Sequence, residues 1–163
     1  MIVIRKAKLK DIDLILNFEK KLIKSADNII NKYCPQHFAD YQLKKEYEKI
    51  LCEYIKGRIY SKNDAIFIAE IKGNPVGHII ISIKKSHPIF NMDKYGRINT
   101  VYIEEKFRSK SISSKLKDEA FKWFKKKNIN RVSLNVLPDN KKAISSYIKW
   151  GFSTGLIEMR MSV

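Results

Sequence analysis

Residues 97–152 constrain the fold more than any other part of the chain, because strand-like and helix-like patterns alternate there. A run of strand-forming residues ends at Ile103, and an amphipathic helix begins near Ser111. A second alternating run covers residues 131–136, and an Asn-led helix then runs to Gly151. Strands that alternate with helices predict crossover connections and parallel strand pairing. This third of the chain therefore predicts the parallel part of a sheet, with a helix starting directly after one strand.

The loop between that strand and its helix is basic. It reads Phe107-Arg108-Ser109-Lys110-Ser111-Ile112-Ser113. A helix N-terminus carries unpaired N–H groups and about half a positive charge. Such a loop suits a phosphate group. A plain strand-to-helix turn with a Ser N-cap accounts for the same residues, so the loop alone leaves both interpretations open.

The remaining patterns predict one α+β domain over residues 1–163, with a mixed, partly parallel twisted sheet flanked by helices. The expected order is β-α-α-β-β-β-α-β-α-β. Asp11 is expected to cap the first helix and Gly57 to end the second. The expected segments are a strand at 1–8, a helix at 11–24, an irregular loop at 25–39, a helix at 41–56, hairpin strands at 65–71 and 76–83 around a turn at 72–75, a strand at 98–103, a helix at 111–128, a strand at 131–136, a helix at 141–150 and a final strand at 152–163.

The net charge of +16 comes from 33 basic and 17 acidic residues, and a field of that sign attracts anions. A nucleic-acid-binding module is therefore one alternative, although the lysines are scattered and no recognised nucleic-acid motif appears. No segment has the apolar length of a membrane helix, and the N-terminus lacks the order of a signal peptide, so we expect a cytoplasmic protein without a membrane partner. Cys34 and Cys52 are expected to be reduced thiols that pack in the fold, without a metal.

A second set of residues makes the pattern more specific. Asn140-Lys141-Lys142-Ala143 is followed by Tyr147, Lys149 and Gly151-Phe152. Together with the loop, the order and spacing of these residues resemble the GNAT superfamily of acetyl-CoA-dependent N-acetyltransferases. The resemblance implies the fold of that family and acetyl-CoA as the acetyl donor.

The resemblance also implies a set of site residues. The strand before the loop would pair with the pantetheine arm through Val101, Tyr102 and Ile103. The loop would bind the pyrophosphate, Asn140 would contact the cofactor, and Tyr147 would be the general acid that protonates the CoA thiolate. Both glycines of the family's loop are replaced by serine here, at Ser111 and Ser113. The six loop positions that correspond to the family's motif are Arg108, Ser109, Lys110, Ser111, Ile112 and Ser113.

Several points stay open at this stage. The residues indicate no general base: Glu104 and Glu105 read as solvated loop residues, His78 as a strand residue and His87 as a loop residue. The acceptor is expected to be a primary amine of a small molecule or a peptide, attacked directly. A CoA-binding protein whose catalysis the serines have weakened is a further alternative. Relatives in the family often form dimers, so the resemblance leads us to expect a homodimer.

Overall fold

The computed structural model describes residues 1–161, which form two compact units. The first unit comprises residues 1–22 and 46–135, and the second comprises residues 23–45 and the chain from residue 136 onward. The long first helix begins in the first unit and ends in the second. Among the described residues, no helix combines the length and apolarity that crossing a bilayer requires.

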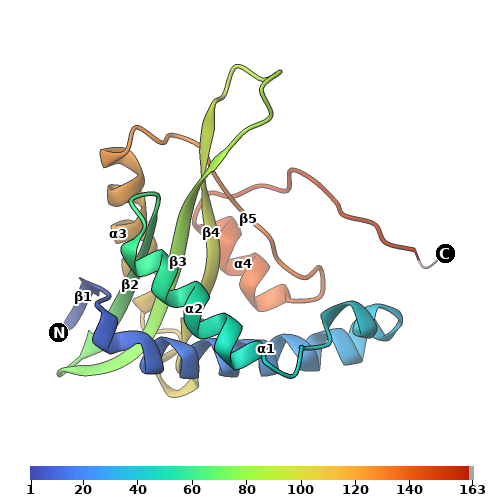
Figure 1. The fold of residues 1–163 in the computed structure, drawn as a ribbon, viewed down its shortest axis with the longest axis horizontal. Coiled ribbons are helices and arrows are strands. Elements are labelled where there is room, and N and C mark those ends of the chain that lie inside the picture. Colours follow the sequence, from blue (N-terminus) through green and yellow to red (C-terminus); the bar gives the residue numbers. More distant parts are fainter. Residues whose placement is uncertain (162–163) are drawn as a thin grey trace. The chain divides into compact units, whose positions relative to one another are not determined.

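The first unit is built on a five-stranded sheet with the order β1-β2-β3-β4-β5 (Figure 1). Neighbouring strands from β1 to β4 are antiparallel, whereas β4 and β5 are parallel. The prediction of a mixed, partly parallel sheet is thus confirmed. The strands are β1 (Ile2–Lys6), β2 (Asp64–Ile71), β3 (Asn74–Lys85), β4 (Lys94–Ile103) and β5 (Val132–Leu134).

The predicted hairpin joins β2 to β3 through a two-residue turn. Lys72 and Gly73 have φ angles of +52° and +77°, and they connect the paired residues Ile71 and Asn74. Two positive φ angles give a turn whose twist matches that of the flanking strands. The hairpin could be predicted because the Lys-Gly pair lies between two strongly β-forming runs.

Helices cover both faces of this sheet (Figure 1). On one face, Ile15 of the first helix and Ile55 of the second join Ile66, Ile68 and Ile80 of the sheet in one buried cluster. On the other face lies the third helix. The helices are α1 (Ile12–Tyr33), α2 (Tyr47–Tyr60), α3 (Ile112–Lys126) and α4 (Lys141–Lys149).

Close contact with β4 fixes the position of α3. The ring of Phe124 lies directly over Gly96, where an added Cβ would come within 2.7 Å of a ring carbon. Phe124 is 1% exposed, so the ring has little freedom to move aside. The glycine therefore allows α3 to approach β4, which places the N-terminus of α3 after the end of that strand.

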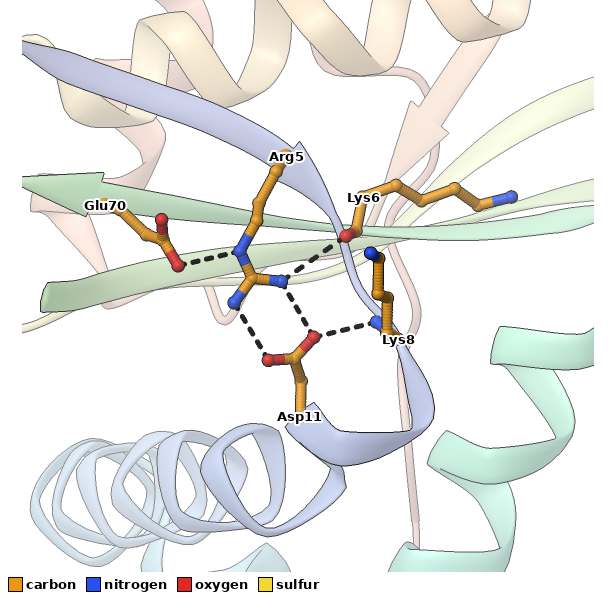
Figure 2. A network of polar contacts seen from close by, with 5 residues as sticks. All are labelled: Arg5, Lys6, Lys8, Asp11 and Glu70. Atoms are coloured by element: carbon orange, nitrogen blue, oxygen red, sulfur yellow. Dashed lines mark hydrogen bonds and ion pairs between the residues drawn. The ribbon is translucent and has the colours of Figure 1, made fainter. Parts of the chain in front are cut away.

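A polar cluster anchors the N-terminus of the chain to the sheet (Figure 2). The Arg5 guanidinium donates to both carboxylate oxygens of Asp11, at 2.8 and 2.9 Å, and to Glu70 at 2.7 Å. Asp11 also accepts the Lys8 backbone N–H at 2.8 Å. Asp11 thus lies just before α1, as predicted, but its carboxylate binds the preceding turn and Arg5.

The second unit contains the C-terminal part of α1, a 3-10 helix (η2, Pro35–Tyr41) and α4. The Arg160 guanidinium pairs with Asp40 at 3.2 Å and lies over the Tyr41 ring, with 5.1 Å from Cζ to the ring centroid. These contacts hold the C-terminal segment against η2. Cys34 of this unit is a half-buried free thiol, as is Cys52 of the first unit.

Several predicted boundaries are wrong. The strand predicted at 98–103 begins at Lys94, four residues earlier. The first helix does not end at residue 24 but continues to Tyr33, because Ile23 and the buried Ile30 lie on one helix face, seven residues apart. The second helix begins at Tyr47 and runs through Gly57 to Tyr60, so the glycine lies inside it.

The predicted last strand is also wrong. Residues 152–161 form no strand, and residues 162–163 lie outside the described part. Alternating side chains predict an extended chain, but a strand also needs a partner with free backbone groups. The observed order is therefore β-α-α-β-β-β-α-β-α, without the final strand.

Candidate active site

The two halves of β4 have different neighbours. Residues 96–98 lie between β3 and β5, because β5 pairs with Gly96, Arg97 and Ile98. The register with β3 continues to Ile103, but β5 pairs with no residue beyond Ile98. One backbone edge of residues 99–103 is therefore unpaired with any strand of the first unit. An open edge of this kind can form hydrogen bonds with an extended ligand.

A β-bulge occurs at the point where β5 departs. Ile81 pairs with Ile98 and Ile80 pairs with Thr100, which leaves Asn99 as an extra residue in β4. The extra residue reverses which face the following side chains occupy. As a result, Thr100 and Tyr102 face α1, where they contact Glu19 and Phe18, rather than α3.

The three predicted pantetheine-binding residues lie along this open half. Val101 and Ile103 are half-buried, whereas Tyr102 is 6% exposed, with its ring 5.3 Å from the Phe18 ring of α1. The Tyr102 side chain is therefore committed to the protein interior. At the open edge, Tyr102 can therefore contact a ligand through its backbone groups rather than through its ring.

The basic loop is tied to the end of β4. A short 3-10 helix (η3, Glu105–Phe107) follows the strand, and the Arg108 Nε donates to the Ile103 carbonyl at 3.2 Å. Lys106 and Lys110 both lie over the Phe107 ring, with their Nζ atoms 5.3 Å from its centroid. These contacts bring two ammonium groups to the loop immediately before α3.

The loop serines differ in backbone conformation. Ser109 and Ser111 have φ angles of +62° and +57°, in the left-handed region that glycine adopts most readily. Ser113 lies within the first turn of α3 and requires no such angle. Of the two serines that replace family glycines, only Ser111 therefore carries a backbone penalty, of about 1–2 kcal/mol.

In the described chain, the Phe107 and Arg108 amides donate to the Glu104 and Glu105 carbonyls, whereas the amides of residues 109–114 donate to no protein acceptor. Ser111 precedes α3, but its side chain makes no capping hydrogen bond. The first amide of the helix to donate to a backbone carbonyl is that of Lys115, which bonds the Ser111 carbonyl at 3.1 Å. The amides of residues 109–114 have no acceptor within the part of the chain that the structure describes. This consecutive series of donors at a helix N-terminus is suited to an anion.

The second predicted element lies in the second unit. Asn140 caps α4, because its Oδ1 accepts the Ala143 backbone N–H at 3.2 Å. The Asn140 Nδ2 group donates to no residue of the described chain, so it is available to a ligand. Asn140 thus combines a capping oxygen with an unused donor.

Tyr147 lies on α4 among aromatic rings. The Trp150 and Phe152 rings approach it edge-on, with centroids at 5.3 and 6.3 Å. Burial raises the pKa of the Tyr147 phenol above its usual value, so the hydroxyl keeps its proton at neutral pH. The loop and Tyr147 belong to different units, and their proximity stays a prediction.

A buried polar cluster beneath α1 was missed by the sequence analysis. His78 Nε2 lies 2.6 Å from Glu19 Oε1, and the Thr100 hydroxyl donates to the same oxygen at 2.7 Å. Glu19 is 5% exposed and His78 is fully buried. The available signal was Glu19 on the apolar side of α1, next to Phe18 and four residues after Ile15.

Of the two carboxylates that the sequence analysis weighed as a general base, one is paired with a lysine and the other is exposed. Glu104 pairs with Lys21 and lies 3.3 Å from the Tyr102 hydroxyl, whereas Glu105 is exposed. Glu104 is therefore not the solvated loop residue that was expected. Within residues 1–161, no cluster of three or more His, Cys, Asp or Glu side chains could hold a metal ion.

Comparison with known proteins identifies the family. A model of the acetyltransferase (GNAT) family matches residues 26–152. The chain belongs to the acetyltransferase (GNAT) family. The resemblance predicted from the loop and the Asn–Tyr–Gly-Phe element is thus confirmed.

Individual relatives agree with this assignment. An uncharacterised N-acetyltransferase of Methanocaldococcus jannaschii is 30% identical over 101 residues, which cover 61% of this chain. The match spans only 43% of that relative's length. A predicted acetyltransferase from Clostridium acetobutylicum, solved with acetyl-CoA, has a TM-score of 0.77 at 20% identity, covering 99% of this chain and 96% of that one.

A second solved structure shares the fold. The aminoglycoside 6'-N-acetyltransferase of Acinetobacter haemolyticus has a TM-score of 0.75 at 14% identity, covering 99% of this chain and 97% of that one. At this level of identity, the likeness establishes a common GNAT fold. The predicted fold class is therefore confirmed by the architecture and by its relatives.

Proposed function

We propose that this protein is an acetyl-CoA-dependent N-acetyltransferase that moves an acetyl group to a primary amine of a small molecule or a peptide. The observation that carries the proposal is the series of unoccupied amides at residues 109–114. Within a GNAT family member, these donors fit the pyrophosphate of the acetyl donor. Arg108 and Lys110 add positive charge on either side of Ser109.

The open half of β4 supports the same proposal. An extended pantetheine arm contains amide groups, which can pair with the free backbone edge of residues 99–103 as an added strand would. Backbone N–H groups on this edge could also polarise the thioester carbonyl. Val101, Tyr102 and Ile103 would contribute through their main chain, in agreement with the buried position of the Tyr102 ring.

In the second unit, the Asn140 Nδ2 group and the Tyr147 hydroxyl would act in the reaction. Asn140 would donate its Nδ2 hydrogens to the cofactor while its oxygen caps α4. Tyr147 would give its proton to the departing thiolate as the amine attacks. Its raised pKa keeps the phenol protonated before the reaction, as a proton donor requires.

Calorimetry with acetyl-CoA tests the proposal, combined with thiol release in the presence of a panel of primary amines. We expect saturable binding and turnover of at least one amine. Tyr147→Phe should bind acetyl-CoA as the wild type does, while kcat falls by about 100-fold or more. Binding without turnover would favour a CoA-binding protein with weakened catalysis, and no heat at millimolar acetyl-CoA would overturn the proposal.

A further inference from the structure

The Glu19–His78–Thr100 cluster places polar and ionisable side chains where apolar ones would be sufficient for packing. A carboxylate and an imidazole are almost completely buried, 2.6 Å apart, between α1 and β3. The rings of Phe18 and His78 stack with centroids 5.6 Å apart, and the Tyr102 ring lies beside both, with its centroid 5.3 Å from Phe18 and 6.4 Å from His78. Burying such groups is unfavourable unless each polar atom finds a partner.

One atom of the cluster lacks that partner. The Nδ1 atom of His78 is buried without a hydrogen bond to any of the described residues. An imidazolium would leave an unpaired N–H at this position, whereas a neutral ring leaves only a lone pair. The neutral ring with its proton on Nε2 therefore fits the geometry. In this form His78 donates to Glu19, which carries the negative charge of the cluster.

Thr100 connects this carboxylate to the open half of β4. Its hydroxyl donates to Glu19 Oε1 at 2.7 Å, and its position on this face depends on the bulge at Asn99. Thr100 is half-buried, whereas Glu19 is 5% exposed and His78 is fully buried, so Thr100 is the most exposed member of the cluster. The oxygen retains lone pairs that can accept a proton from a ligand.

We propose that Glu19 receives the proton of the attacking amine through the Thr100 hydroxyl, with His78 holding the carboxylate in place. This inference rests on the proposed acetyl transfer. As the nitrogen forms its bond to the acetyl carbon, the amine proton moves to Thr100 Oγ1. The hydroxyl proton moves to Glu19 Oε1, the carbon–sulfur bond breaks, and the thiolate takes a proton from the general acid. After the product leaves, the Glu19 proton returns to solvent by the same path, and the general acid takes up a proton from solvent.

The other titratable groups around Glu19 do not replace it. On β4, Tyr102 is next in line on the same face, and burial raises the pKa of its phenol. On α2, burial raises the pKa of the Tyr54 phenol, with a smaller contribution from Glu19, and the ring also contacts Arg58. A phenol that holds its proton is a poor proton acceptor. Lys21, on α1, is paired with Glu104.

Glu19→Gln tests the relay, because glutamine keeps the size and an accepting oxygen but cannot take up the proton. With an amine that the wild type acetylates, we expect kcat to fall about 100-fold or more, with KM for acetyl-CoA and calorimetric affinity within twofold of wild type. Thr100→Val should show the same loss, and Thr100→Ser should recover most of kcat. Asp11→Asn is the matched control, since Asp11 is equally buried at 5% exposure and should lose stability but not kcat.

The outcomes separate this inference from the proposed function. A Glu19→Gln variant with wild-type kcat would overturn the relay and leave acetyl transfer intact. A variant that also loses acetyl-CoA affinity would overturn it in favour of a structural role. If the wild type binds acetyl-CoA but acetylates no amine, both the relay and the proposed transfer are overturned.

Discussion

The Arg5–Asp11–Glu70 cluster and the Glu19–His78–Thr100 cluster both lie in the first unit and contain a buried carboxylate, but their polar atoms are paired to different extents. In the first, the Arg5 guanidinium contacts both carboxylates and Asp11 accepts a backbone N–H as well (Figure 2). In the second, one carboxylate has only uncharged donors in the tautomer that fits, and a buried ring nitrogen has no partner. We infer that the matched charges of the first cluster serve stability, whereas the incompletely paired carboxylate of the second is available for chemistry.

The largest expected effect on stability comes from breaking the matched cluster. Arg5→Ala leaves the buried Asp11 carboxylate without its main partner, and we expect it to lower the free energy of unfolding by about 3 kcal/mol. Urea denaturation measures the change. Arg5→Lys keeps the charge but not the bidentate geometry and should lose less. A loss below about 0.5 kcal/mol in Arg5→Ala would show that this cluster is not a stabilising one.

A smaller effect concerns pH. The hydrogen bonds from Arg5 lower the pKa of Asp11 in the folded protein. The stability that this group adds is therefore fully present above its unfolded pKa of about 4, and is lost as pH falls through the folded-state pKa. We expect the stability difference between wild type and Arg5→Ala to shrink as denaturation is repeated at decreasing pH below 4. A difference that stays constant would contradict the role of Asp11.

The Glu19–His78–Thr100 cluster should respond to loss of its charges in the opposite way. Replacing Glu19 by Met and His78 by Leu together removes the buried charge and the unpaired nitrogen. We expect the free energy of unfolding to change by less than about 1 kcal/mol, or to rise, because apolar replacements of buried pairs are often neutral or stabilising. Acetyl transfer should be lost. A strongly destabilised double variant would show that this cluster stabilises the fold, as the Arg5–Asp11–Glu70 cluster does.

The elements that could be predicted from the sequence are those that local chemistry determines. The Lys72-Gly73 turn, the capping Asn140 and the apolar faces of α3 were visible because each depends on residues close in the chain. The Glu19–His78 pair was not visible, since its members are 59 positions apart and only the sheet register and the bulge bring Thr100 to the same face. The last strand was predicted wrongly because alternation along residues 152–163 does not reveal whether a partner strand is available.

The loop serines should give the smallest effects. Ser111→Gly relieves the left-handed conformation but makes the unfolded chain more flexible, so we expect a stability change within about 0.5 kcal/mol. Ser113→Gly gains nothing of this kind and should cost about 0.5 kcal/mol through lower helix propensity. Acetyl-CoA affinity should stay within twofold for both. A tenfold rise in Ser111→Gly would instead show that the serine weakens cofactor binding.

The proposed function depends above all on binding of the donor's pyrophosphate by the amides of residues 109–114. Nuclear magnetic resonance of the nitrogen-15-labelled protein tests it most directly, because each amide gives its own signal during an acetyl-CoA titration. We predict saturable shifts that are largest in residues 109–114 and extend along residues 99–103. Saturable binding that leaves the 109–114 amides unmoved, or no binding at millimolar acetyl-CoA, would contradict the account.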